Sequence, residues 1–154
     1  MSTVTVAKTA GFCFGVRRAV ELAEQQAEKN GEIWAYGEII HNMHEITRLE
    51  KCGVRTAHTL AEIPDGAKVL IRAHGVPRAV YDTLADKKCE IFDATCPFVQ
   101  KIHRIADEES RAGRLVVILG SAGHPEVAGI EGWCGASVVL DGEAQVQAFA
   151  DDPA

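Results

Sequence analysis

The sequence has 154 residues, 47% of them hydrophobic, and its 16 lysines and arginines against 22 aspartates and glutamates leave a formal net charge of −6. This composition is typical of a globular protein whose core needs no disulfide bonds. The basic residues do not cluster, which argues against nucleic-acid binding, and the longest aliphatic run, 115–119, is too short to cross a membrane.

Strands and helices are expected to alternate along the chain, as judged from apolar runs and from apolar residues at helical spacing. The predicted strands are 3–9, 32–36, 68–73, 89–93, 115–119 and 137–140. The predicted helices are 16–30, 42–52, 77–84, 96–113, 126–132 and 143–150. This alternation implies right-handed crossovers and mostly parallel sheets, so the fold class is α/β.

The helix that follows Thr95 marks the predicted division of the chain. Thr95 is expected to be its N-cap, with Pro97 in the first turn. The residues expected to face inward are Val99, Ile102 and Ile105. Because this helix could bridge two sheets, we expect a first α/β unit at 1–95 and a second at 96–154. The second unit looks truncated, since the sequence ends one helix after a strand.

Chemically active side chains follow most of the predicted strands. In parallel sheets, ligands bind at the carboxyl ends of the strands, where loops lead into helix N-termini. The residues at these positions are Cys13, His41, His74, Cys96, His124 and Glu126. Such a placement favours a common site over a scatter of core residues.

The five cysteines are an odd number in a sequence with no export signal, which predicts a reduced, cytoplasmic protein. Cys13 and Cys96 each precede a predicted helix, whose N-terminal partial charge favours a thiolate. Gly11 and Gly15 flank Cys13 and permit a tight turn with free N–H groups. A free cysteine is more often a small buried apolar residue, but the placement favours metal ligands here. The other cysteines, Cys52, Cys89 and Cys134, lie outside such junctions.

Two histidines are adjacent to glycines that would let a ligand approach the backbone. His74 precedes Gly75, and His124 follows Gly123 in a loop that resembles an anion-binding nest. Both imidazoles could donate to phosphate oxygens. His41 and His44 have a spacing that gives only a weak zinc signal. The histidines expected at the surface are His44, His58 and His103.

Five segments together resemble the 4-hydroxy-3-methylbut-2-enyl diphosphate reductases, the IspH/LytB family, which end the non-mevalonate isoprenoid pathway. The segments are 11–19 (GFCFGVRRA), 40–42 (IHN), 73–76 (AHGV), 93–97 (DATCP) and 123–127 (GHPEV). They occur in the family order and spacing over the whole chain, and no single segment would carry the resemblance alone.

The resemblance implies an oxidoreductase built from three similar parallel-sheet α/β units in a pseudo-threefold, trefoil-like arrangement. Its 4Fe-4S cluster is held by three cysteines, two of which match Cys13 and Cys96. His41, His74 and His124 match the residues around the diphosphate, and Glu126, with His124 beside it, matches the acid that supplies protons. Two electrons and two protons would remove the substrate hydroxyl as water, giving isopentenyl and dimethylallyl diphosphates. The electrons come from ferredoxin or flavodoxin in that family.

The sequence departs from the family pattern at its end. The third cysteine ligand of the family lies downstream, and Cys134 is too early to match it, so the loop 132–135 is expected to be local packing. The chain therefore looks like an N-terminal fragment with one complete unit and part of a second, although a split subunit or a degenerate copy stays open. Two other classes also stay open: a non-catalytic binding module and a zinc hydrolase that uses cysteine and histidine ligands.

Overall fold

A computed structural model describes residues 3–151 of the chain. In chain order the elements are α1 (Phe14–Asn30), β1 (Ile33–Tyr36), α2 (Met43–Lys51), β2 (Val54–Ala57), the 3-10 helix η1 (Leu60–Glu62), β3 (Lys68–Ile71), α3 (Arg78–Asp86), β4 (Glu90–Asp93), α4 (Pro97–Arg111), β5 (Val116–Leu119), α5 (Pro125–Glu131), β6 (Ser137–Leu140) and α6 (Glu143–Asp151). The predicted alternation of strands and helices is confirmed. Only β2 and η1 were not predicted.

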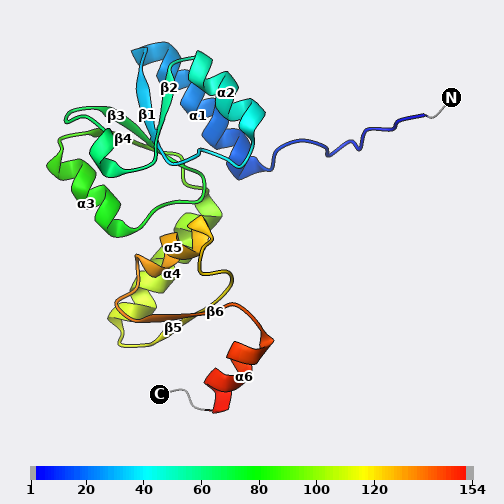
Figure 1. Cartoon of the computed structure of the whole chain (residues 1–154), viewed down its shortest axis with the longest axis vertical. Helices are drawn as coiled ribbons and strands as arrows, with labels where there is room; N and C mark the ends of the chain where they lie inside the picture. The colour runs from blue at the N-terminus through cyan, green and yellow to red at the C-terminus, as the bar shows by residue number, and fades with distance from the viewer. Residues whose placement is uncertain (1–2, 152–154) are drawn as a thin grey trace.

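The first sheet has four parallel strands in the order β2-β1-β3-β4. Helices α1 and α2 lie on one side of it and α3 on the other (Figure 1). Ala19 and Ala23 of α1 have no exposed surface and pack with Leu70 of the central strand β3. Val69 and Ile71 point to the opposite face and pack with Leu84 of α3, so the alternation of side chains along β3 fills both cores.

Short side chains let α1 approach this sheet closely. The buried positions Ala19, Ala23 and Ala27 recur every four residues and form one face of the helix. The helix ends at Gly31, whose φ of 79° lets its N–H donate to the Ala27 carbonyl at 2.8 Å. The opposite end of α1 begins after Cys13, its N-cap.

The second sheet consists of the parallel strands β5 and β6. Helix α4 runs from the end of β4 toward this sheet, and α5 packs beside α4 (Figure 1). The last helix, α6, has no buried residue. The assignment of 1–95 and 96–154 to two units stays a prediction, although the two sheets are separate in the structure.

The inward face of α4 differs from the predicted one. Val99 is buried as expected, but Ile102 and Ile105 are 42% and 46% exposed, and the other buried residues are His103 and Ala106. A helix has 3.6 residues per turn, so a face that begins at Val99 continues at positions four and seven residues later. Residues spaced strictly three apart, as in the prediction, rotate away from this face along the helix.

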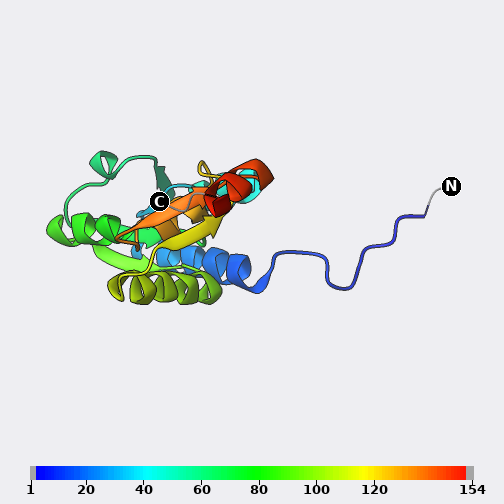
Figure 2. The ribbon, with the colours of Figure 1, turned by 90° about the horizontal axis from the view of Figure 1, so that it is seen from below.

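The strand predicted at 3–9 is wrong. These residues form no strand and leave the body of the molecule as an extended segment (Figure 2). Val4 and Val6 are 88% and 75% exposed. β-Branched residues favour an extended backbone, but a strand also needs a neighbour for its hydrogen bonds, and none of the described strands pairs with this segment. Within residues 3–151, no helix is long and apolar enough to span a bilayer.

Candidate functional site

Three histidines from three separate loops meet at the carboxyl edge of the sheets. His41 follows β1, His74 follows β3, and His124 follows β5 of the second sheet. The ring centroids of His41 and His74 are 4.6 Å apart, and that of His124 lies 6.2 Å and 6.0 Å from them. Residues far apart in the sequence, from both sheets, thus form one histidine cluster.

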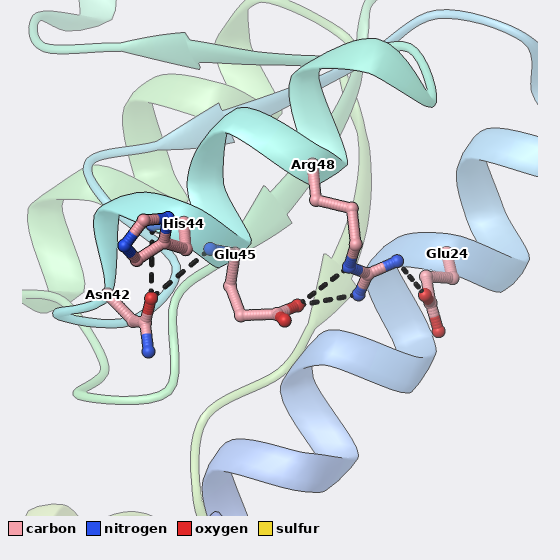
Figure 3. A network of polar contacts seen from close by, with 5 residues as sticks. All are labelled: Glu24, Asn42, His44, Glu45 and Arg48. Atoms are coloured by element: carbon pink, nitrogen blue, oxygen red, sulfur yellow. Dashed lines mark hydrogen bonds and ion pairs between the residues drawn. The ribbon is translucent and has the colours of Figure 1, made fainter.

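The loop that carries His41 is held by the start of α2. The side chain of Asn42 accepts hydrogen bonds from the N–H groups of His44 and Glu45, at 3.1 Å and 3.2 Å (Figure 3). One turn later, Arg48 pairs with Glu45 on α2 and with Glu24 on α1 (Figure 3). The N-cap fixes the start of α2, and the Arg48–Glu24 ion pair links α2 to α1. Both contacts restrain the loop residue just before the cap, His41.

His74 is half-buried and electrostatically unfavourable to protonate. Burial, together with His41, Arg72 and His124, lowers its pKa to about 4. Its Nδ1 atom is buried and has no hydrogen-bond partner among residues 3–151. The ring is therefore neutral at pH 7, and a negative charge placed beside it would favour its protonation.

His124 is the N-cap of α5, and this role selects its tautomer. Its Nδ1 accepts a hydrogen bond from the Glu126 N–H at 3.2 Å, so the proton of the neutral ring is on Nε2. Pro125, between them, occupies the first helical position. A cavity of about 320 Å³ is lined by His124, Glu126 and the loop residues Gly120 and Ser121. The Nε2–H donor and the half-buried carboxyl group therefore belong to one rigid turn.

Cys13 and Cys96 are the N-caps of α1 and α4, and neither side chain makes a capping hydrogen bond. Cys13 was predicted to lie between a strand and a helix. The helix α1 is present, but no described strand precedes Cys13. The N-cap predicted at Thr95 is wrong by one residue, because α4 begins at Pro97 and its first main-chain hydrogen bond is accepted by the Cys96 carbonyl. A Cβ atom added to Gly15 would lie 2.6 Å from Cys96 Sγ. The first turn of α1, which starts directly after Cys13, therefore packs on the Cys96 side chain.

The chemistry of this pair fits part of a metal–sulfur site. Both thiols are free, both sit at helix N-termini, and the missing side chain of Gly15 leaves room for Cys96 Sγ. Residues 3–151 contain no group of three or more histidine, cysteine, aspartate or glutamate side chains placed to hold a metal ion. The histidine cluster is thus not arranged as a zinc site within the described residues.

The remaining cysteines lie elsewhere. Cys52 is the exposed C-cap of α2, and Cys89 precedes β4. Cys134 contacts the Ile130 carbonyl at 3.4 Å, and burial, together with Glu131 and Asp107, raises the pKa of its thiol. The surroundings of Cys134 therefore do not favour a thiolate.

His103 was predicted at the surface and is instead 4% exposed. Its ring stacks on Trp133 with centroids 5.4 Å apart, and Arg78 lies over the same indole at 4.7 Å. Trp133 also donates its Nε1–H to the Val76 carbonyl at 3.0 Å, so the loop 132–135 packs as expected and ties α5 to the loop after β3. The sequence did contain a signal for this burial, because His103 lies four residues after Val99 and so on the same face of α4. His44 and His58 are exposed, as predicted.

The fold and this site define a class of protein: a parallel-sheet α/β protein with an anion-suited histidine cluster and a pair of helix-capping cysteines. The model of the LytB protein family matches residues 4–153, and the chain belongs to this family. It is 43% identical over 138 residues to a 4-hydroxy-3-methylbut-2-enyl diphosphate reductase of Clostridioides difficile (strain 630), covering 89% of this chain and 50% of that protein. It is 42% identical over 142 residues to the reductase of Geobacter metallireducens (strain ATCC 53774 / DSM 7210 / GS-15), covering 92% and 50%.

Solved structures agree with this assignment. A structure of (E)-4-hydroxy-3-methyl-but-2-enyl diphosphate reductase, the terminal enzyme of the non-mevalonate pathway, superposes with a TM-score of 0.80 at 36% identity, covering 96% of this chain and 53% of that one. The reductase from Plasmodium falciparum gives a TM-score of 0.88 at 28% identity, covering 91% and 45%. The chain spans about half the length of the curated relatives it matches.

Proposed function

We propose that this chain forms the part of a 4-hydroxy-3-methylbut-2-enyl diphosphate reductase that binds the substrate diphosphate and supplies two cluster ligands. The observation that carries the proposal is the meeting of the His41, His74 and His124 rings within 4.6–6.2 Å of one another. A chain with a net charge of −6 has no general attraction for an anion, so a diphosphate requires a local set of donors of this kind.

The histidine cluster suits a diphosphate because one of its donors is fixed before the ligand arrives and a second ring is held neutral beside it. His124 presents an Nε2–H donor, since its Nδ1 is occupied by the Glu126 N–H. His74 is held neutral and lacks a partner for its buried Nδ1 among residues 3–151. Phosphate oxygens would accept from these rings, and their negative charge would stabilise additional protons on them.

Cys13 and Cys96 would hold an iron–sulfur cluster, for which the full site takes one further protein thiolate from outside residues 3–151. When bound, such a cluster would pass the two electrons of the reaction to the substrate one at a time. An external one-electron donor of the ferredoxin or flavodoxin type would replace them. This part of the proposal is supported by the free thiols at two helix N-termini and by their approach at Gly15.

Glu126, with His124, would deliver the proton that accompanies C–O cleavage. Hydroxide is a poor leaving group, so the hydroxyl must be protonated as the C–O bond breaks and it leaves as water. The two electrons and the second proton then form the new C–H bond of the product. A positioned acid contributes typically about 10² to 10⁴-fold to such a step. The half-buried Glu126 carboxyl lies in the first turn of α5, two residues from the His124 donor. The same turn can therefore donate a hydrogen bond to the phosphate through His124 and a proton to the hydroxyl through Glu126.

Anaerobic iron–sulfur reconstitution tests this assignment. In an intact reductase that contains this sequence, Cys13→Ser or Cys96→Ser should abolish the broad visible absorbance of the cluster. Cys89→Ser is the matched control and should retain it, because Cys89 lies before β4, away from the helix N-termini. Equal loss from Cys89→Ser, or bound zinc without iron and sulfide, would contradict the proposal.

A further inference from the structure

We propose that Arg18 and Gly15 are positioning residues that hold Cys96 at a set place relative to Cys13. The inference rests on the proposed function, because the two thiols matter as a pair only if they share a ligand. It concerns the two thiol groups before any ligand is present.

Arg18 connects α1 to the segment that leads into Cys96. Its Nη1 donates to the Thr95 carbonyl and its Nη2 to the Asp93 carbonyl, both at 3.2 Å. The two accepting residues are 77 and 75 positions away in the sequence. Arg18 forms no ion pair within the described part of the chain, so its guanidinium is used for these main-chain carbonyls.

The planar fork of a guanidinium explains why an arginine suits this position. Two N–H groups of fixed geometry reach two carbonyls of one short segment, which restrains the orientation of that segment as well as its distance. A lysine would carry the same charge on a single freely rotating group. The segment between the two accepting carbonyls also turns on itself, since the Thr95 N–H donates to the Asp93 side chain at 2.8 Å. Cys96 follows directly.

Gly15 provides the second contact between α1 and Cys96. It is buried in the first turn of α1, and an added Cβ would lie 2.6 Å from Sγ and 2.9 Å from Cβ of Cys96. Its backbone is helical, so the glycine is not required by an unusual φ angle. Glycine inside a helix is about 1 kcal/mol less favourable than alanine. The close approach of the cysteine is therefore the physical reason for a glycine here.

Together these contacts fix both cysteines to the same helix. The Cys13 carbonyl accepts the first main-chain bond of α1 from Arg17 at 3.0 Å, and the Cys96 carbonyl accepts the corresponding bond of α4 from Gln100 at 2.9 Å. Arg18 and Gly15 lie within five residues after Cys13, on the turn that touches Cys96. The thiols are thus arranged by the fold, and a shared ligand would not have to reorganise the two loops.

Thiol cross-linking measures this arrangement without a cluster. In the full chain with Cys52, Cys89 and Cys134 replaced by serine, dibromobimane reacts first with one thiol and then closes between Cys13 and Cys96. The rate of closure divided by the rate of single alkylation gives the effective concentration of one thiol at the other. We expect rapid closure in this parent protein, and its absence would overturn the inference.

Arg18→Met should lower the effective concentration about tenfold, because two charge-assisted hydrogen bonds are lost. Arg18→Lys should recover part of it, and Arg17→Met, an exposed neighbour on the same helix, should leave it unchanged. Circular dichroism and urea unfolding identify any variant that is not folded. If Arg18→Met does not fold, the lysine variant decides: parent-like closure would overturn the role of the guanidinium fork.

Gly15→Ala tests the second contact, with Gly142→Ala as its control because a Cβ at Gly142 meets nothing within 4 Å. We expect slower closure for the first variant only. Parent-like closure in folded Arg18→Met and Gly15→Ala proteins would overturn the inference and leave the proposed function intact. Slower closure in both, combined with full cluster absorbance in Cys13→Ser, would support the positioning role and contradict the proposed function.

Discussion

At single residues, the site depends on which imidazole nitrogens carry protons. The Glu126 N–H fixes which ring nitrogen of His124 carries the proton, and burial together with His41, Arg72 and His124 keeps the His74 ring neutral. Both effects depend on the tertiary fold, because the two rings belong to loops that follow different strands. The same turn that orients His124 also carries Glu126, whose role can be separated from binding by substitution.

Glu126→Gln should lower turnover of an intact reductase by at least about a hundredfold, the low end of the range for acid catalysis. Glutamine keeps the size and hydrogen-bonding capacity of the side chain but has no acidic proton. Cluster absorbance and substrate affinity should stay close to wild type, and the exposed Glu108→Gln should have no effect. Turnover near the wild-type rate would instead leave Glu126 as a carboxylate that stabilises the helix dipole of α5.

His74 should make the protein less stable in mild acid. Its pKa is about 4 in the folded chain and about 6.5 when unfolded, so the unfolded state binds the proton first as the pH falls. The contribution to stability is full above about pH 6.5 and is lost between pH 6.5 and 4, at up to about 1.4 kcal/mol per pH unit. The half-buried ring makes this slope an upper limit.

Urea unfolding at several pH values measures this effect. His74→Asn should flatten the pH dependence, while a part remains because burial also lowers the pKa of His103. The exposed His44→Asn should keep the wild-type slope. An unchanged slope in His74→Asn would mean that the ring is hydrated in the folded protein.

At the level of elements, the junction between the two sheets depends on α4 and α5. Trp133, just after α5, is contacted by His103 from α4 and Arg78 from α3, and it donates to the Val76 carbonyl. The Arg78 N–H also donates to the Gly132 carbonyl at 3.3 Å. Because His74 lies in the loop before these contacts and His124 precedes α5, the junction sets how the histidines meet.

Trp133→Ala should lower the free energy of unfolding by about 2 to 4 kcal/mol, through lost packing, stacking and one hydrogen bond. Trp133→Phe should cost about 1 kcal/mol, since it keeps an aromatic ring and loses the N–H donor. Val146→Ala on α6, a helix with no buried residue, is the control and should change little. Urea unfolding followed by circular dichroism measures all three, and equal stability of the alanine variant and wild type would contradict this role.

At the level of the whole molecule, the chain places two candidate thiolates and leaves a large apolar side chain exposed beside one of them. Phe98, the second residue of α4 and two positions after Cys96, is 71% exposed. Two thiolates leave two irons of a four-iron cluster without protein ligands. We therefore expect the 154-residue chain alone to give substoichiometric, labile iron after anaerobic reconstitution.

Iron and sulfide analysis before and after gel filtration checks this expectation. Loss of most of the iron on the column agrees with a site that takes a further ligand. Retention of four irons and four sulfides per chain would contradict it and would indicate a ligand among these residues that the cysteine pattern misses, or a dimer that shares cysteines.

The sequence alone determined the α/β class, the order of most elements and the family resemblance. These follow from local patterns: helical spacing in α1, apolar runs in β3 and β5, and short motifs that keep their order along the chain. Helix propensity, caps and hydrophobic periodicity act over a few residues, so they can be recognised without knowing the fold.

Only the tertiary structure decided which residues meet. The segment 3–9 has the composition of a strand but no pairing partner, whereas the short, polar β2 is a strand because it pairs with β1. His103 is buried because α4 turns that face toward Trp133. The approach of Gly15 to Cys96 likewise joins segments about 80 residues apart. Pairing, burial and proximity of this kind are set by non-local contacts, which periodicity along one chain does not specify.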